Sequence, residues 1–519
     1  MANKSLFASI AGMLLPRADA QNHAGGPAYA LTPRHKLAQL AATGSLNRTF
    51  YADARDQLDD VLLTALDVDP AFIAKTAIYA RRRGYMKDMP ALLVALLSTM
   101  ETHDFSKAFP RVIDNGKMLR SFVQIMRSGA VGRKSMGSRP KRFVANWLER
   151  ASDIEIMRAS VGQDPSLADV IKMVHPKPGT REREALYGYL IGRPYDVSAL
   201  PQIAQDFEAF KRNPSRTPPD VPFQMLTALP LTGEHWAAIG SKGGWQMLRM
   251  NLNTFARHGA FDVSWFPRKA AARLRDPAEI KRARVFPYQL MAAYAAADDK
   301  VPRMVREALQ DAMEISISNV PRIDGRVVVC PDVSGSMSSP VTGYRKGATS
   351  GVRCIDVAGL VTAAFLRANP ETRVLPFEND VVDVYLNPRD SVMTNAQRLA
   401  SIGGGGTNCS APLAKLVAER ARVDLVVFIS DNESWIDARY GGRGTATMEM
   451  WEKLKRRNPD AKLVCIDIQP YGTTQAAERA DVLNIGGFSD SVFEMISAFA
   501  KDELDAGHWV GEIEKIDLG

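Results

Sequence analysis

Residues 327–338 read Val-Val-Val-Cys-Pro-Asp-Val-Ser-Gly-Ser-Met-Ser, an apolar β-branched run followed by a polar loop. A short continuous apolar run of this kind is typical of a buried parallel strand. Open α/β sheets bind ligands at the loops that follow the carboxyl ends of their strands. This loop carries three oxygen side chains, Asp332, Ser334 and Ser336. We therefore expect a site for a hard cation at the end of this strand.

Two later stretches add oxygen side chains to this candidate site. Residues 403–408 read Gly-Gly-Gly-Gly-Thr-Asn and place Thr407 on a glycine loop, and residues 425–431 form a second apolar strand that ends in Asp431. Each piece alone has an ordinary structural explanation, because Asp and Ser often cap the next helix and glycine runs form loops. Together the three loops favour a divalent cation, Mg²⁺ first and Mn²⁺ as the alternative.

The same residues argue against catalysis. Ser334 has no histidine in its motif, and Asp-Val-Ser is neither a pair of carboxylates nor a Gly-x-Ser-x-Gly turn. We predict that the protein is not an enzyme and has no catalytic residues.

Composition describes an ordinary globular protein of two or more domains. The chain has 519 residues, of which 46% are hydrophobic and 24% charged, and its four cysteines all lie in the C-terminal part. They are too few and too scattered for a disulfide framework. Residues 1–20 imitate a secretion signal, but Arg17 and Asp19 occupy places where small neutral residues are preferred. No apolar segment approaches the ~20 residues that span a bilayer, so we predict a cytoplasmic protein without a membrane partner.

The pattern of apolar residues divides the chain into two parts. Residues 35–320 carry repeated helix start and stop signals, such as Asp69-Pro70 with Gly84, which favours an α-solenoid of helix pairs. After residue 323 strands and helices alternate, as in a doubly wound, mainly parallel sheet. We therefore predict an α plus α/β protein, with one domain at residues 1–322 and the other at residues 323–519.

Charge separates the same two parts. Residues 1–322 carry 45 Lys and Arg against 31 Asp and Glu, a net charge of +14, and residues 323–519 carry 21 against 27, a net charge of −6. A basic domain beside an acidic one suggests that the first binds a polyanion, most plausibly nucleic acid. Residues 115–148 contain no acidic residue, although a solvated basic face normally interleaves acids. The cations of this acid-free span that we expect to bind phosphate are Arg120, Arg127, Arg133, Lys134, Arg139, Lys141 and Arg142.

The C-terminal part closely resembles von Willebrand factor A domains, and the five oxygen side chains match their metal-ion-dependent adhesion site. The whole chain resembles the Ro autoantigen family of TROVE-domain RNA-binding proteins, in its bacterial form. That resemblance rests on Met126-Arg-Ser-Gly, Gly132-Arg-Lys, residues 142–147, Val174-His-Pro-Lys-Pro178 and the three loops around Asp332, Thr407 and Asp431.

The Ro resemblance implies a HEAT-like helical-repeat ring that is closed by the von Willebrand factor A domain, in a monomeric protein. It implies binding of small noncoding Y-like RNA on the outer basic surface and of the 3′ ends of misfolded RNA in the central hole. RNA quality control with a 3′–5′ exoribonuclease such as polynucleotide phosphorylase would follow. His175 matches the family's RNA-contacting histidine, Arg158 falls at a basic contact position, and a neighbouring family arginine aligns with Gly162. Lys172 and Lys177 join the set because of their charge and proximity to His175.

A second class of function uses the same five oxygens. In a metal-dependent adaptor, the cation would accept a carboxylate from a protein partner, and the helical part would serve an ATPase or another complex. The acid-free span favours RNA, because a protein-binding scaffold has no need of it.

Overall fold

The computed structural model describes residues 15–519 except 45, 215–216, 286, 318–319, 321, 345–350, 437, 439–443, 470, 488 and 505–506. Most of the signal-like stretch, residues 1–14, therefore lies outside the described residues. Contacts between residues divide the chain into two compact units. The first comprises residues 1–89, 286–292 and 316–517, and the second comprises residues 90–285, 293–315 and 518–519. The division of the sequence at residues 322 and 323 stays a prediction.

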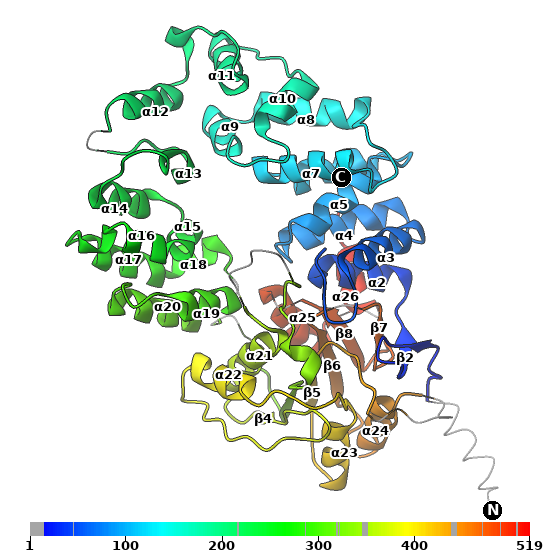
Figure 1. Ribbon diagram of the computed structural model, residues 1–519. Coiled ribbons are helices and arrows are strands. Elements are labelled where there is room, and N and C mark those ends of the chain that lie inside the picture. The colour runs from blue at the N-terminus through cyan, green and yellow to red at the C-terminus, as the bar shows by residue number, and fades with distance from the viewer. Residues whose placement is uncertain are drawn as a thin grey trace, which may run out of the picture. The chain divides into compact units, whose positions relative to one another are not determined.

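The first unit is built on a five-stranded parallel sheet in the order β4-β3-β5-β6-β8 (Figure 1). Its strands are rich in Val, Ile and Leu because both faces are covered by helices. One face buries Val328, Val426 and Leu463 against Leu416 of α23 and Trp451 of α24. On the sheet, α21 also packs against β3 and α25 against β8. The bounds are β3 Val327–Pro331, β4 Arg373–Val374, β5 Leu425–Ser430, β6 Lys462–Asp467, β8 Val482–Gly486, α21 Cys354–Ala368, α22 Val392–Ala400, α23 Ala411–Ala418, α24 Ala446–Lys455, α25 Asp490–Ala500 and α26 His508–Glu514.

The N-terminal residues are part of this unit. Strand β2 (Pro27–Ala30) pairs with β1 (Ala20–Gln21) and with β7 (Thr473–Thr474), and Tyr29 lies opposite Thr474. Helix α2 (Pro33–Thr43) packs on α3 (Ala54–Leu66), α4 (Pro70–Arg82) and the sheet strand β8. His35 of α2 is buried, and its Nε2 lies 2.9 Å from the carbonyl oxygen of Asn484 in β8. The opening of the chain is thereby held on the α/β domain.

The second unit is helical, as the sequence predicts. Several of its helices begin at capping residues, since the side chain of Asn115 accepts the N–H groups of Lys117 and Met118, and Ser152 and Ser166 form capping boxes. The helical stretch over residues 245–257 is interrupted at Asn251. The bounds are α5 Asp88–Leu97, α6 Asp104–Val112, α7 Gly116–Ser128, α8 Ser138–Arg150, α9 Asp153–Ala159, α10 Leu167–Val174, α11 Arg181–Ile191, α12 Gln202–Arg212, α13 Phe223–Leu226, α14 Gly233–Lys242, α15 Trp245–Met250, α16 Leu252–Arg257, α17 Phe266–Arg275, α18 Pro277–Ala283, α19 Pro287–Ala296 and α20 Arg303–Ser316, with α5, α19 and the last residue of α20 crossing the division of the units.

Candidate metal site and basic surface

The three predicted loops meet at the carboxyl edge of the sheet, because β3 and β5 are neighbours in it. Asp332 follows β3, and its Oδ1 accepts the N–H of Ser334 at 2.8 Å while its Oδ2 accepts the hydroxyl of Ser430 at 2.7 Å. Ser334 Oγ lies 3.3 Å from Ser336 Oγ and accepts the hydroxyl of Thr407 at 3.0 Å. Asp431 lies beside the side chain of Ser336, and its Oδ1 accepts the N–H of Glu433 at 3.2 Å. The five predicted oxygen side chains thus form one connected cluster.

The glycine loop has a backbone that places Thr407. Gly403, Gly404 and Gly405 all have positive φ, which disfavours any other residue. A Cβ on Gly405 would lie 2.5 Å from Oε2 of Glu378. The loop is tied to the first loop, since Gly335 N donates to Gly405 O at 3.1 Å and Gly404 N donates to Val333 O at 3.1 Å. The four glycines therefore do more than provide flexibility, because they let Thr407 approach Ser334.

The side chains of this cluster are buried, which disfavours the charged form of its two carboxylates. None of its five side chains is more than 6% exposed. Burial, followed by the charge of Asp431, raises the pKa of Asp332 to about 7. Burial also raises the pKa of Asp431 itself. Buried carboxylates of this kind are stabilised by protons or by a bound cation.

Two further carboxylates, which the sequence did not single out, lie beside Asp431. Burial and the charge of Asp431 raise the pKa of Glu433 to about 8 and that of Asp467 well above its usual value. Glu433 Oε1 and Asp467 Oδ1 are buried without a hydrogen-bond partner. Asp467 ends β6, so the strand-end rule that finds Asp431 could have found it. Glu433 lies in the loop after β5, as far beyond the strand end as Ser334 lies beyond β3, so the same rule could have found it too.

These features fit a hard cation. Within the described part of the chain, no three His, Cys, Asp or Glu side chains come together as metal ligands. A cation at this place would therefore need the hydroxyls of Ser334, Ser336 and Thr407 beside Asp332 and Asp431. Hydroxyl and carboxylate oxygens are the ligands that Mg²⁺ accepts, and the orphaned carboxylate oxygens of Glu433 and Asp467 could hold its coordinated waters.

The predicted basic surface lies in the helical unit, where α10 packs against α7 and α8. Arg127 of α7 and Lys172 of α10 both lie close enough to Asp169 to lower the pKa of its carboxyl group, although its main hydrogen bonds come from Ser166. The packing of the helices thus places the carboxylate of Asp169 near Arg127, although the acid-free span that contains Arg127 has no acidic residue of its own. The exposed cations are Arg127, Lys134, Arg142, Arg158, Lys172 and Lys177, and Arg133 and Lys141 are partly exposed.

Two predicted phosphate ligands point their guanidinium groups into the protein instead. Arg139 donates to the carbonyl oxygens of Leu97, Ser98, Met100 and Thr102 at 3.3, 3.1, 2.9 and 2.7 Å, and it lies 5.1 Å from the ring centre of Phe105. These carbonyls lie at and beyond the C-terminal end of α5, where helical partners run out, and those of Leu97 and Met100 also accept the N–H groups of Met100 and Thr102. Arg120 donates to the carbonyl of Val161 at 2.7 Å, and burial lowers its pKa. Their arrangement supports a structural role for both arginines.

The predicted RNA-contacting residues at and near His175 differ in their hydrogen bonds and ion pairs. His175 is exposed and ends α10 with a φ of 51°, and its N–H donates to the carbonyl of Ile171 at 3.0 Å. The backbone N–H of Lys177 donates to Oε1 of Glu149 at 2.9 Å, and the side chain of Lys177 is exposed. Arg158 is exposed and lies 3.6 Å from Asp220. Gly162 has a φ of 115°, and a Cβ there would lie 2.4 Å from Nη1 of Arg120, so the neighbouring arginine of the Ro family cannot simply be restored.

Comparisons with known proteins cover the domain that holds the candidate metal site and the helical part that holds the basic surface. Residues 326–500 match the family model of the Ro60 vWA domain. The chain is 25% identical over 520 aligned residues to RNA-binding protein RO60 of Deinococcus radiodurans, which covers 93% of this chain and 96% of the relative. The C-terminal domain therefore matches the Ro60 vWA family, and the chain as a whole is similar to an RNA-binding protein RO60.

The chain is similar to two further proteins. It is 22% identical over 248 residues to RNA-binding protein RO60 of Caenorhabditis elegans, which covers 45% of this chain and 36% of the relative. Its fold matches the crystal structure of the Deinococcus radiodurans RO (RSR) protein with a TM-score of 0.64 and 21% identity, over 91% of this chain and 100% of that chain. The predicted fold class, a helical N-terminal region followed by a von Willebrand factor A-like domain, is confirmed.

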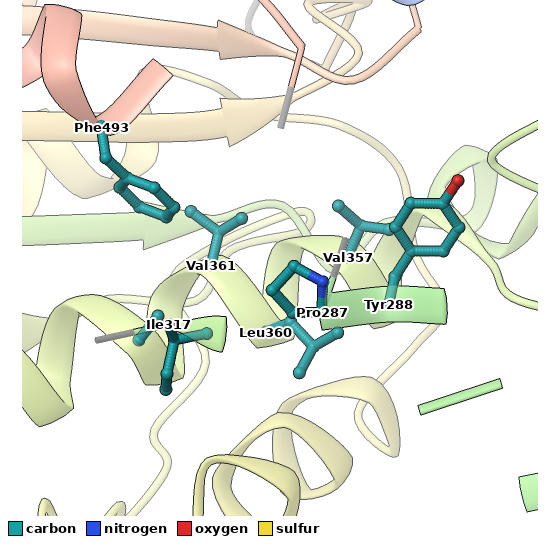
Figure 2. Close-up of a pocket in the computed structure, with 8 residues that line it drawn as sticks. Pro287, Tyr288, Ile317, Val357, Leu360, Val361 and Phe493 are labelled. Atoms are coloured by element: carbon teal, nitrogen blue, oxygen red, sulfur yellow. The ribbon is translucent and has the colours of Figure 1, made fainter. Parts of the chain in front are cut away.

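Elsewhere the first unit has a small apolar pocket, shown in Figure 2. It is lined by Pro287, Tyr288, Ile317, Val361 and Phe493 among others, and its volume is about 20 Å³. Such a volume could hold one water, but a water needs polar partners that these walls do not provide. We regard the pocket as a packing gap. Among the described helices, none is long and apolar enough to span a bilayer.

Proposed function

We propose that this protein binds RNA through the exposed cations of α7, α8 and α10 and the segment after α10. The observation that carries the proposal is the gathering of Arg127, Lys172, His175 and Lys177 on helices that pack together, in a chain whose relatives are RNA-binding proteins. Lysine and arginine neutralise phosphates and release counterions, which provides affinity without sequence preference. An exposed histidine can stack on or hydrogen-bond to an unpaired base.

The RNA that we propose is a small noncoding Y-like RNA, together with single-stranded 3′ ends of misfolded RNA. A folded RNA would place loops and bulges beside His175, and its helical phosphates would meet the surrounding cations. The biological role would be quality control of noncoding RNA in the cytoplasm, in cooperation with a 3′–5′ exoribonuclease such as polynucleotide phosphorylase. We assign the protein no catalytic role of its own.

We further propose that Mg²⁺ or Mn²⁺ binds at Asp332, Ser334, Ser336, Thr407 and Asp431. Support comes from the connected oxygen cluster and the orphaned buried carboxylate oxygens beside it. The bound cation would neutralise the buried carboxylates and hold the three loops together. In the alternative function, a metal-dependent adaptor, this cation would accept a carboxylate from a protein partner, and the exposed Trp435 and Ile436 beside the glycine loop would offer apolar contact.

RNA binding is tested by fluorescence anisotropy with a hairpin RNA and an unstructured 3′ tail over a range of salt concentrations. The variants are Lys172→Gln and His175→Asn, because asparagine tolerates the positive φ at this helix end and replaces the imidazole alone. Arg303→Gln is the matched control, since Arg303 lies in the same unit and forms an exposed pair with Glu307.

Lys172→Gln should flatten the log-log salt dependence by about 0.7 to 0.9 for both RNAs. His175→Asn should weaken the hairpin more than the tail, and Arg303→Gln should change neither. An affinity that does not depend on salt, or equal behaviour of all variants, would favour the adaptor. Crosslinking and sequencing of RNA bound in the cell would then identify the natural ligand.

A further inference from the structure

The candidate metal site is covered by residues from the opening of the chain. Asn22 Nδ2 donates to the carbonyl of Ser434 at 2.6 Å, and the N–H of Ala24 donates to Oε2 of Glu433 at 3.3 Å. Gly26 lies so close to Ser434 that a Cβ would be 2.4 Å from its carbonyl oxygen. The N-terminal segment therefore follows the loop after β5 through direct polar contacts, within one compact unit.

Tyr51 brings a hydroxyl group from this N-terminal region to the site. Its phenol lies beside the side chain of Ser336, the same side chain that lies beside Asp431. Burial, with the charge of Asp431 as the next cause, raises the pKa of Tyr51, so the phenol is neutral at physiological pH. The hydroxyl is thus next to one of the five predicted ligands.

Three aromatic rings, those of Phe50, Tyr471 and His23, pack around this phenol, and the ring centre of Phe50 lies 4.7 Å from that of Tyr51. The ring centre of Tyr51 lies 5.3 Å from that of Tyr471 at an angle of 89°, and 6.3 Å from that of His23 at 29°. His23 and Tyr471 also touch edge to face at 5.3 Å. The hydroxyl of Tyr471 is occupied elsewhere, since it donates to Gln469 at 2.9 Å. Such aromatic pairs add to the stability of a buried cluster beyond their area alone.

In an adhesion-type metal site, one ligand position of the cation stays open for a carboxylate of another molecule. In this chain, Ser336 is the most exposed of the five oxygen side chains, at 6%, and it is the one that meets the Tyr51 hydroxyl. We propose that Tyr51 is a positioning residue of the metal site, which orients Ser336 and closes the site to carboxylates from other molecules. This inference rests on the proposed binding of a cation by the five oxygens.

The closed site gives the cation a role within the chain. It would join the loops after β3 and β5 to the segment that carries His23 and Tyr51, so that binding of the cation stabilises the attachment of the N-terminal residues. The hydroxyl of Tyr51 would not touch the cation itself but would hold the ligand Ser336 in position. Loss of such a partner typically weakens metal binding by about 10- to 100-fold.

The test uses Mn²⁺ as the probe with the full-length protein. Calorimetry measures its affinity, and the relaxation of water protons reports whether small molecules reach the bound ion. Tyr51→Phe removes the hydroxyl and keeps the ring, and Tyr51→Ala removes both. Tyr385→Ala is the matched control, because Tyr385 lies in the same unit and is 81% exposed. An Asp332→Ala, Asp431→Ala double variant shows which part of the binding belongs to this site.

We expect Tyr51→Phe to weaken Mn²⁺ binding by about tenfold and Tyr385→Ala to leave it unchanged. Acetate should alter the water relaxation of Mn²⁺ bound to Tyr51→Ala, but not that of Mn²⁺ bound to the wild type or to Tyr385→Ala. Equal affinities and equal acetate responses in all folded variants would overturn the role of Tyr51 and leave the metal site intact. If Mn²⁺ does not bind the wild type, or binds the double variant equally, the metal site itself is wrong and this inference with it. Circular dichroism checks folding, and Tyr51→Phe still decides the question if Tyr51→Ala fails to fold.

Discussion

Arg139 and Arg142 lie one turn apart on α8 and should respond to substitution in opposite ways. Both belong to the acid-free span, and the sequence predicts that both bind phosphate. Arg139 instead donates to four carbonyl oxygens at and beyond the end of α5, whereas Arg142 is exposed. We therefore predict that Arg139→Met destabilises the fold and that Arg142→Met weakens RNA binding. Methionine keeps much of the side-chain length and removes the charge and the donors in both cases.

The contacts give the size of the effect on stability. A hydrogen bond from a charged donor contributes about 1.5 to 3 kcal/mol, and a cation–π contact of this kind adds about 0.5 to 2 kcal/mol. The four bonds share one guanidinium, and Arg139 is only partly buried, so water can satisfy some of the carbonyls that it leaves. We expect Arg139→Met to lower the free energy of unfolding by about 2 to 4 kcal/mol. Arg142→Met should change it by less than about 0.5 kcal/mol.

Urea unfolding followed by circular dichroism measures the first effect, and salt titration of RNA binding measures the second. Arg142→Met should flatten the log-log salt slope by about 0.7 to 0.9, while Arg139→Met, kept in conditions where it is folded, should leave the slope unchanged. A stable Arg139→Met protein with a flatter slope would refute the structural role. An Arg142→Met protein with an unchanged slope would refute the proposed phosphate contact.

Three other predictions follow from single sites. The Asp332→Ala, Asp431→Ala variant should lose Mn²⁺ binding in calorimetry and keep its RNA affinity, because the basic surface lies in the helical unit; a parallel loss of RNA binding would contradict this separation. Burial lowers the pKa of His35 to about 4, below its unfolded value, so its contribution to stability is present above pH 6.5 and is lost as the pH falls toward 4. Urea unfolding at pH 7.5 and 4.5 should therefore show about 2 to 3 kcal/mol less pH-dependent loss in His35→Gln than in the wild type, and equal losses would exclude this cause. Gly162→Ala should destabilise the protein by about 1 to 3 kcal/mol in the same assay, since alanine meets both the positive φ and the guanidinium of Arg120; an unchanged midpoint would show that the loop rearranges without strain.

The core of the candidate metal site could be predicted from the sequence because its loops obey a local rule. Apolar runs mark β3 and β5, and the polar residues after them must meet if the strands are parallel neighbours. Asp332 and Asp431 meet in this way. The covering residues His23 and Tyr51 could not be found like this, because no periodicity or spacing links them to strands that lie far along the chain. The pairing of β2 with β7 that holds their segment is equally non-local.

The basic surface shows the opposite limit of sequence reasoning. Counting charges finds the cations correctly, but it cannot tell which way a side chain points. Asp169 reaches Arg127 through the packing of α10 on α7, although it lies outside the acid-free span. Arg120 and Arg139 turn inward because carbonyl groups at loops and helix ends need donors, and arginine provides several in one fork.

The inward arginines also change what the acid-free span means. A cation that binds backbone carbonyls needs no carboxylate partner, so the absence of acids near Arg120 and Arg139 does not itself indicate phosphate. Seven phosphate contacts from the span would give a salt slope of about −5 to −6, whereas the five cations that remain give at most about −3.5 to −4.5. Lys172, Lys177 and Arg158 must supply any further contribution, because they are exposed cations outside the span. A triple glutamine variant of these three should therefore flatten the slope by up to about 2 to 3 units, and a slope that stays constant would confine RNA binding to the span itself.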